Sequence, residues 1–256
     1  INIIYGEFVT QNTLEVSKNK ILGGSISLFQ PKKGFRVSID SILLCSSIKR
    51  YSNCMEFGTG SGVILVYLSK KYPNSNIIGI EKNIELVELA KRNLLENKIN
   101  NNNTMVICND ILKKPFLNNY NNTLDRVIMN PPYFRINNVI KSDNKLKASA
   151  RYESNINQWF LAAYKKLKPK GYMNFVFRSE DLDLVLSKLY SSWGDMKIFP
   201  LWPKANVKSK LMIMQARKNA NSGVQILPGL ILHNNDGSYT EECNSILNNK
   251  SNIQLD

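Results

Sequence analysis

The tetrapeptide Asn130-Pro131-Pro132-Tyr133 has residue types suited to chemistry on a planar amino group. The lone pair of such a group is conjugated, so it is a weak nucleophile. The side-chain oxygen of Asn130 and the backbone carbonyl of Pro131 can accept both N–H groups and favour a pyramidal form with a free lone pair. The prolines stiffen the loop, and Tyr133 can stack on a planar target with a gain of ~1–3 kcal/mol. An Asn-Pro pair alone is a common turn signal, but the whole tetrapeptide after a strand predicts a catalytic loop.

A glycine-rich segment, Glu56-Phe57-Gly58-Thr59-Gly60-Ser61-Gly62, follows an expected strand and opens an expected helix. Glycines allow a tight turn and let a ligand approach the backbone. The spacing is not the G-x-G-x-x-G of dinucleotide binders, and no Gly-Lys-Ser/Thr follows as in a P-loop. Glu56 would repel a pyrophosphate, but it suits a ligand with ammonium or hydroxyl groups, such as the amino-acid part of S-adenosylmethionine.

Polar residues also stand where the next two expected strands end. Glu81 follows the loop by roughly 20 residues, where an acid can accept both ribose hydroxyls. Asn109-Asp110 can hydrogen-bond the adenine amino group. Turn and cap residues are often Asp or Asn, but a glycine loop with acids at two strand ends predicts a cofactor site. Contacts with S-adenosylmethionine are expected from Glu56, Gly58, Thr59, Gly60, Gly62, Glu81, Lys82, Asp110, Ile111 and Asn130.

The two motifs together predict methyl transfer to an amino nitrogen. Transfer relieves the positive charge of the sulfonium, so no strong general base is needed and the proton can leave afterwards. Positioning of the reactants would then supply much of the rate acceleration.

The elements that must hold these motifs alternate between strand and helix. Strands are expected at 54–57, 76–81, 104–108, 124–129, 172–177, 198–201 and 211–216, and helices at 62–71, 84–97, 158–167 and 181–190. This order predicts βαβ units in a doubly wound, mainly parallel sheet of α/β class. The short connection with Pro203 suits a hairpin, so one antiparallel strand is expected near the sheet edge.

Residues 1–50 have a different pattern. Gly23-Gly24 predicts a small hairpin, and 38–48 predicts a helix leading into the sheet. We expect 1–50 to be an extension packed on the core, and 51–256 to be one methyltransferase domain. With 256 residues and 43% hydrophobic content, the chain can form one sizeable core.

Net charge indicates a class of partner. The chain has 34 Lys and Arg against 20 Asp and Glu, a net charge of +14, which favours a polyanion such as nucleic acid. An AT-rich genome, which the many Asn, Lys and Ile residues suggest, would explain part of that charge. Between Phe134 and Glu153 a basic segment beside the catalytic loop is suited to clamping RNA phosphates, although a solvated loop is the simpler alternative. Substrate contacts are expected from Arg36, Tyr133, Phe134, Arg135, Lys145, Lys147 and Arg151.

Other classes of protein are disfavoured. No run of apolar residues reaches the ~18–20 of a membrane helix, and no signal peptide is visible, so a cytoplasmic location is expected. The four cysteines are widely spaced and His233 is the only histidine, so neither a disulfide framework nor a metal site is expected. We expect a monomer that binds no metal.

The motifs EFGTGSG, IIGIEKN, CND and MNPPY resemble those of the class I Rossmann-like amino-methyltransferases, over about residues 53–217. More narrowly, the chain resembles the bacterial tRNA1(Val) adenosine N6-methyltransferase family. Gln30-Pro31 with the segment 34–44 resembles the family's Q-P…G-[YF]-R-F-[ST]-x-D-[SA]-x-L-L. Phe134 extends the catalytic motif to NPPYF, and Ala150-Arg151-Tyr152-Glu153 resembles A-R-x-E.

That resemblance implies a seven-stranded sheet with one antiparallel strand, and S-adenosylmethionine as cofactor. It implies transfer of methyl to N6 of the adenosine 3′ of the anticodon of a valine tRNA. The residues carried over are Asn130 to Tyr133 as the catalytic loop, and Glu56, Gly58, Gly60, Glu81 and Asp110 as the cofactor site. Two positions depart from the family: Glu56 replaces the usual Asp, and Ile136-Asn137-Asn138 stands where a glycine is typical.

Alternative functions remain open at this point. Glutamine methyltransferases that act on release factors also use Asn-Pro-Pro-Tyr, because a carboxamide is an equally poor nucleophile. Another RNA, DNA adenine, or a non-catalytic module that keeps the fold are further alternatives. The positive charge disfavours a protein substrate, the chain length leaves little room for a DNA-recognition domain, and the intact tetrapeptide disfavours a module without activity.

Overall fold

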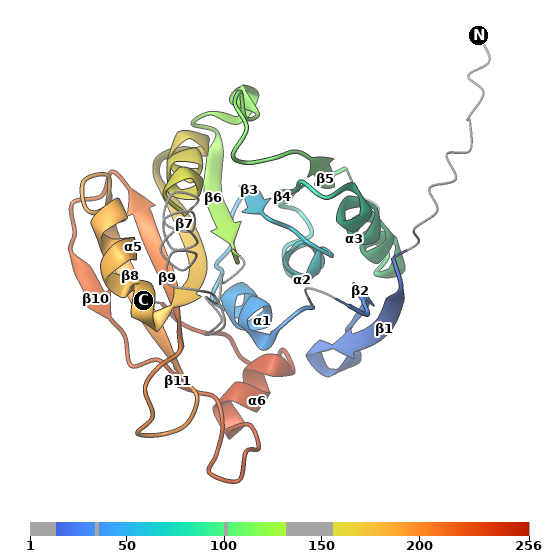
Figure 1. The fold of residues 1–256 in the computed structure, drawn as a ribbon, viewed down its shortest axis with the longest axis vertical. Coiled ribbons are helices and arrows are strands. Elements are labelled where there is room, and N and C mark those ends of the chain that lie inside the picture. The colour runs from blue at the N-terminus through green and yellow to red at the C-terminus, as the bar shows by residue number, and fades with distance from the viewer. Residues whose placement is uncertain (1–13, 34–35, 100–101, 132–155, 256) are drawn as a thin grey trace, which may run out of the picture.

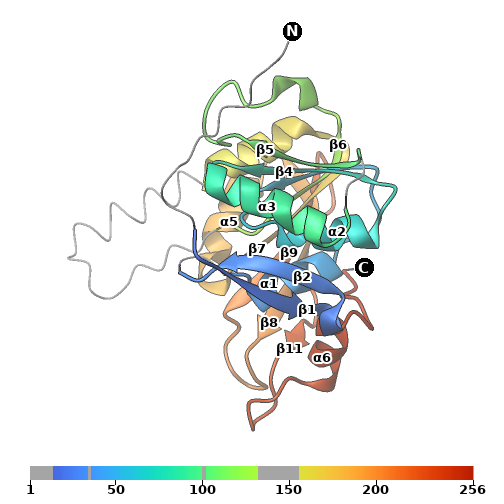
Figure 2. The same ribbon diagram turned by 90° about the vertical axis from the view of Figure 1, so that its right-hand side faces the viewer.

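The computed structural model describes residues 14–33, 36–99, 102–131 and 156–255. A central sheet is covered by helices on both faces, and a small hairpin packs at one side (Figures 1 and 2). Within the described residues the sheet has nine strands in the order β10-β8-β9-β7-β6-β3-β4-β5, with β11 also paired to β8. Its strands are β3 (Asn53–Phe57), β4 (Asn76–Glu81), β5 (Thr104–Cys108), β6 (Leu124–Met129), β7 (Leu167–Arg178), β8 (Trp193–Trp202), β9 (Leu211–Lys218), β10 (Val224–Ile226) and β11 (Leu230–Ile231).

Helices flank the sheet in two layers. Leu43 and Leu65 belong to a buried core on one face, and Phe160 and Leu189 belong to a core on the other. On the first face lie α1 (Ile39–Ser46), α2 (Val63–Lys71) and α3 (Ile84–Glu96); on the second lie a helix at 156–166 and α5 (Leu182–Leu189) (Figure 1). Short 3-10 turns are η1 (Leu22–Gly24), η2 (Asn118–Tyr120) and η3 (Ser179–Asp181). The predicted doubly wound α/β fold is confirmed.

Strand direction decides where a ligand can bind. Strands β3, β4, β5, β6 and β7 are parallel neighbours, so their carboxyl ends lie at one edge of the sheet. Strand β9 is antiparallel to both β7 and β8, which confirms the predicted hairpin. The central strands β3 and β6 are buried on both faces and therefore have continuous apolar runs.

The N-terminal hairpin pairs β1 (Val16–Ile21) with β2 (Ile26–Pro31), as predicted. Two asparagines of α3 hold β2. Asn93 accepts from Phe29 N–H at 2.7 Å and donates to Phe29 O at 2.9 Å, and Asn97 makes the equivalent pair with Ser27. The amide of Asn93 also donates to Ser61 O in the glycine loop at 2.8 Å. We propose on this basis that the extension and the sheet domain form one structural unit.

The C-terminal segment contains elements that the sequence did not predict. Strands β10 and β11 extend the sheet beyond the expected seven strands, and they are too short to show a periodic pattern. Helix α6 (Glu241–Leu247) begins at Thr240, whose hydroxyl accepts from Cys243 N–H at 3.2 Å. Cys243 and Ile246 are buried in the same core as α1. A Thr before two glutamates is an N-cap signal that would have predicted this helix.

Three further findings concern the described part of the chain alone. None of its helices has the length and apolarity to cross a bilayer. No group of three or more potential metal ligands is found among these residues. All four cysteines are free thiols.

Candidate active site

A pocket of about 280 Å³ opens at the carboxyl edge of the sheet. Its walls come from the glycine loop after β3, the ends of β4, β5 and β6, helix α1 and the helix at 156–166. Ten of the predicted site residues line it: Glu56, Gly58, Thr59, Gly60, Glu81, Lys82, Asp110, Ile111, Asn130 and Pro131. The structure therefore brings the glycine motif and the start of the Asn-Pro-Pro-Tyr motif to one cavity.

The glycine loop is held against β4 by its backbone. The N–H groups of Gly58 and Thr59 both donate to Ile80 O, at 2.9 and 3.0 Å. Gly60 has φ +57°, and no atom lies within 4 Å of the place where a Cβ would stand, so a ligand can approach this backbone. Gly62 is different, because its Cβ would lie 3.0 Å from that of Ala90. Gly62 does not line the pocket; it permits close packing of α2 on α3.

Glu81 ties the loop to the end of β4. One carboxylate oxygen accepts from Gly60 N–H and the other from Asn83 N–H, both at 2.9 Å. The side chain is almost buried, with 9% exposure. Each oxygen has a further lone pair, so the carboxylate can accept two ligand hydroxyls while it holds the loop.

Glu56 is the least solvated acid of the pocket. It is 2% exposed, and its Oε2 atom has no hydrogen-bond partner among the residues that the structure describes. Burial raises the pKa of Glu56 to about 8, and the nearby carboxylate of Glu81 adds to the effect. A buried carboxyl oxygen without a partner is costly, so this site favours a cationic or hydrogen-bond-donating group.

The third strand end provides a polar turn beside apolar walls. Asp110 accepts from Leu112 N–H at 3.0 Å, and Asn109 N–H donates to Glu81 O at 2.9 Å. Ile80, Leu86, Ile111 and Leu112 line the same part of the cavity. A planar heterocycle fits such an apolar slot with polar groups at its rim.

Asn130 lies where β6 ends, and its side chain contacts a helix from the N-terminal extension. The amide nitrogen donates to the hydroxyl of Ser41 on α1 at 2.9 Å. Ser41 is 3% exposed and lines the pocket. Because the nitrogen is directed to Ser41, the Asn130 oxygen is the atom that can accept a substrate N–H.

Sequence reasoning missed Ser41 and the aromatic wall. Trp159, on the helix at 156–166, lines the pocket and packs edge-on against Phe57 at 6.2 Å between ring centroids. A Cβ on Gly58 would lie 2.9 Å from its ring. Both residues follow ordinary helical patterns, so no local signal marks them, although Ser41 lies in a segment that carries the family resemblance.

Other predicted residues lie elsewhere. Arg36 is exposed, does not line the pocket, and donates to Asn19 Oδ1 at 3.1 Å. Seven predicted site residues lie outside the described residues: Pro132, Tyr133, Phe134, Arg135, Lys145, Lys147 and Arg151. Their roles stay predictions.

Comparison with known proteins gives the family. A family model described as "Methyltransferase small domain" matches residues 35–188, more than half of the chain. The chain belongs to the methyltransferase small domain family. One curated relative, a tRNA1(Val) (adenine(37)-N6)-methyltransferase of a Flavobacteriaceae bacterium, is 34% identical over 110 residues, which cover 42% of this chain and 46% of the relative. A protein of the same name from Vibrio campbellii is 21% identical over 221 residues, covering 84% and 88%.

The fold has close counterparts among solved structures. A predicted O-methyltransferase from Agrobacterium tumefaciens superposes with a TM-score of 0.70 at 17% identity, covering 84% of this chain and 98% of that one.

The chain spans from 46% to 65% of the length of three curated relatives.

S-adenosylmethionine is the cofactor of this chain, and the pocket residues fit it. The unpartnered Oε2 of Glu56 suits the ammonium of the methionine part. Glu81 has acceptors for the ribose, and the open side of Gly60 admits a ligand. The slot beside Ile111 suits the adenine.

Proposed function

We propose that this chain transfers a methyl group from S-adenosylmethionine to the exocyclic N6 of an adenosine in tRNA, the adenosine 3′ of the anticodon of a valine tRNA. One observation carries the proposal: Asn130, the first residue of the amino-group motif, lines the same pocket as Glu56 and Glu81. The names of the curated relatives support the tRNA and the nucleotide.

One set of pocket residues binds the cofactor and another binds the substrate. Glu56, Glu81 and Asp110 orient the cofactor, which supplies an electrophilic methyl group. Asn130 Oδ1 and the carbonyl of Pro131 accept the two N–H groups of the adenine N6. That geometry turns the nitrogen lone pair toward the methyl group, and the amino group gives up a proton afterwards. Positioning at near-contact distance is the main source of acceleration.

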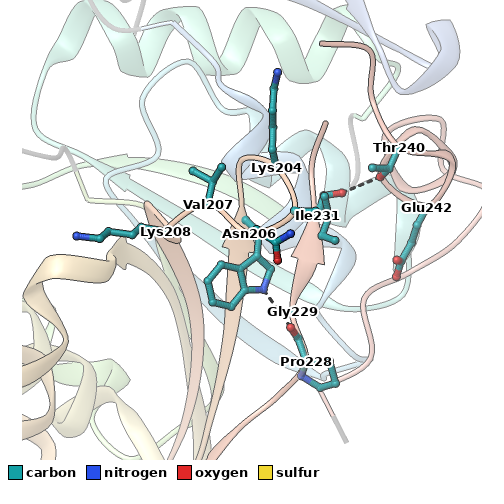
Figure 3. Close-up of a pocket in the computed structure, with 11 residues that line it drawn as sticks. Lys204, Asn206, Val207, Lys208, Pro228, Gly229, Ile231, Thr240 and Glu242 are labelled. Carbon is teal, nitrogen blue, oxygen red and sulfur yellow. Dashed lines mark hydrogen bonds between the residues drawn. The ribbon is translucent and has the colours of Figure 1, made fainter. Parts of the chain in front are cut away.

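Basic side chains at the same edge of the sheet as the pocket support RNA as the substrate. Strand β8 runs parallel to β7, so the loop between β8 and β9 lies at the same edge of the sheet as the pocket. Lys208 and Lys210 are exposed there. A second cavity, of about 770 Å³, lies at this loop. In Figure 3, Lys204 and Lys208 extend away from each other. A tRNA that reaches Asn130 also needs phosphate contacts of this kind.

The proposed function also has consequences for the oligomeric state and the location of the protein. We propose that the chain acts as a monomer, because residues of one chain build the described part of the pocket. We propose a cytoplasmic location, because the tRNA substrate is found there.

A transfer assay tests the substrate. The protein is incubated with methyl-labelled cofactor and either unmodified total tRNA or an unmodified release factor. Incorporation into tRNA, with N6-methyladenosine at the nucleotide 3′ of the valine anticodon by mass spectrometry, is the expected result. Label in release factor alone would favour glutamine N5 methylation instead. No label in RNA would contradict the proposal.

Ser41→Ala tests the contact that orients Asn130. Loss of the acceptor at 2.9 Å removes one hydrogen bond of about 1 kcal/mol, so kcat is expected to fall about fivefold. The KM for S-adenosylmethionine should stay within about twofold, because Ser41 is not assigned to the cofactor. Ser41→Thr keeps the hydroxyl and should recover most of the rate. An unchanged kcat in Ser41→Ala would show that this contact does not position Asn130.

A further inference from the structure

A third cavity, lined by charged side chains, lies at the opposite edge of the sheet from the active site. It measures about 480 Å³ and lies where β6 and β7 begin and β9 ends. The segment Arg50–Ser52 before β3 closes one side of it. We call this cavity the cationic pocket. It shares no described lining residue with the cofactor pocket, and the proposed mechanism assigns no role to it.

Positive charge dominates the lining of the cationic pocket. Five basic side chains line it: Arg50, Arg126, Lys168, Lys170 and Arg217. Among the described lining residues, Asp125 is the one acidic side chain. It already pairs with Lys168 and accepts from the N–H groups of Ser52 and Asn53. Asp195 lies 4.0 Å from Arg217. The pocket therefore keeps an excess of positive charge.

Arg126 is the buried centre of this group. It is 4% exposed, and one N–H donates to Asn174 Oδ1. Its Nε has no hydrogen-bond partner, and no ion pair links it to a carboxylate within the described ranges. Removing a cation from water without an anion beside it is unfavourable. A bound anion would offset that cost.

Two tyrosines complete the arrangement. The ring of Tyr172 lies between two guanidinium groups, with Arg126 at 5.0 Å and Arg217 at 5.1 Å from its centroid. The hydroxyl of Tyr51 is buried and has no hydrogen-bond partner in the described part of the chain. The pocket thus has two buried donors without acceptors, together with accessible cations at its mouth.

We infer that the cationic pocket binds a phosphate-bearing ligand. Guanidinium groups match the oxygens of phosphate in geometry, and the excess of several positive charges suits a multiply charged anion better than a single carboxylate. The ligand is either a free oligophosphate or a phosphate of bound RNA. The inference does not depend on the proposed methylation, because the two pockets lie at opposite edges of the sheet.

Calorimetric titration with inorganic pyrophosphate tests the inference. The full chain is titrated at 0.15 M salt in the presence of saturating S-adenosylhomocysteine, so that the cofactor pocket is filled. Binding of one pyrophosphate is expected. Arg50→Gln and Arg217→Gln should each weaken it about tenfold, since each removes one charge from the mouth of the pocket. Lys91→Gln, an exposed lysine of α3 that pairs with Glu88, removes the same charge far away and should leave the affinity unchanged.

Measurements of tRNA binding, with and without pyrophosphate, distinguish the two sources of the phosphate. If RNA supplies it, Arg50→Gln weakens tRNA binding and pyrophosphate competes with tRNA. If a free oligophosphate supplies it, the affinity for tRNA is unchanged and pyrophosphate binds to the tRNA complex. No pyrophosphate binding by the wild type, or equal affinities in all variants, would overturn the inference. Arg50 is exposed, so Arg50→Gln serves even if Arg217→Gln fails to fold.

Discussion

Asn130→Ala is expected to reduce kcat by about 10²–10³, the range seen when one preorganised hydrogen-bonding group is removed from a catalytic site. The variant loses the acceptor that we assign to the adenine N6, while the other residues assigned to the cofactor, among them Glu56 and Glu81, are untouched. The affinity for S-adenosylmethionine should therefore remain within a few-fold of wild type. Single-turnover kinetics with tRNA and calorimetry with the cofactor measure the two quantities separately.

A matched asparagine in the same pocket provides the control. Asn109 also lines the cavity, but at the end of β5, where we place the adenine of the cofactor. Asn109→Ala is expected to raise the KM for S-adenosylmethionine with little change in kcat. If Asn130→Ala instead weakens the cofactor strongly and turns over normally at saturation, the assignment of Asn130 to the amino group is wrong.

Glu56→Gln should weaken cofactor binding by at least tenfold at pH 8. Burial raises the pKa of Glu56 to about 8, with a further contribution from Glu81, so the free protein holds this carboxyl group largely protonated at neutral pH. Binding the ammonium of the cofactor requires the carboxylate, and the proton must leave. The affinity of the wild type should therefore increase by up to tenfold for each unit by which the pH is raised toward about 8, and it should level off above that pH. The affinity of Glu56→Gln should lack this dependence.

Although Glu56→Gln should weaken cofactor binding, it should increase the free energy of unfolding of the protein without cofactor at alkaline pH. The folded protein keeps a proton on Glu56 that the unfolded chain releases near its ordinary pKa of 4.5. The stability contributed by that proton is complete below pH 4.5 and is lost as the pH rises through about 8. Glu56→Gln avoids this loss. It should be more stable than wild type by a few kcal/mol at pH 8.5, with the difference shrinking toward pH 4.5.

Urea unfolding of both proteins without cofactor, at pH 5.5 and pH 8.5, measures this difference. Glu85→Gln is the control, because Glu85 is an exposed acid at the start of α3, and its stability difference should not vary with pH in this way. Equal pH dependence of cofactor affinity in wild type and Glu56→Gln would show that the cofactor ammonium does not contact Glu56.

Much of the fold followed from local patterns. The apolar runs of β3 and β6, the helical spacing of α3 and the short Pro203 connection each depend on residues that are neighbours in the chain. The structure confirms these elements within a few residues. The helix expected at 158–167 spans 156–166, and β7 begins at Leu167, because the backbone after the helix already pairs with β6 at Leu124. Pairing between distant strands decides such boundaries.

The sequence by itself predicted an amino-group chemistry for Asn130-Pro131-Pro132-Tyr133, and it determined the grouping of Glu56, Glu81 and Asp110 at strand ends, because residue type and strand direction suffice for both. Only the tertiary structure showed that Ser41 holds the Asn130 amide, since the two residues are 89 positions apart. Only it showed that one oxygen of Glu56 is buried without a partner among the described residues, and that four other basic residues join Arg126 at the far edge of the sheet. Burial and charge pairing depend on which distant segments pack together, and no local pattern contains that information.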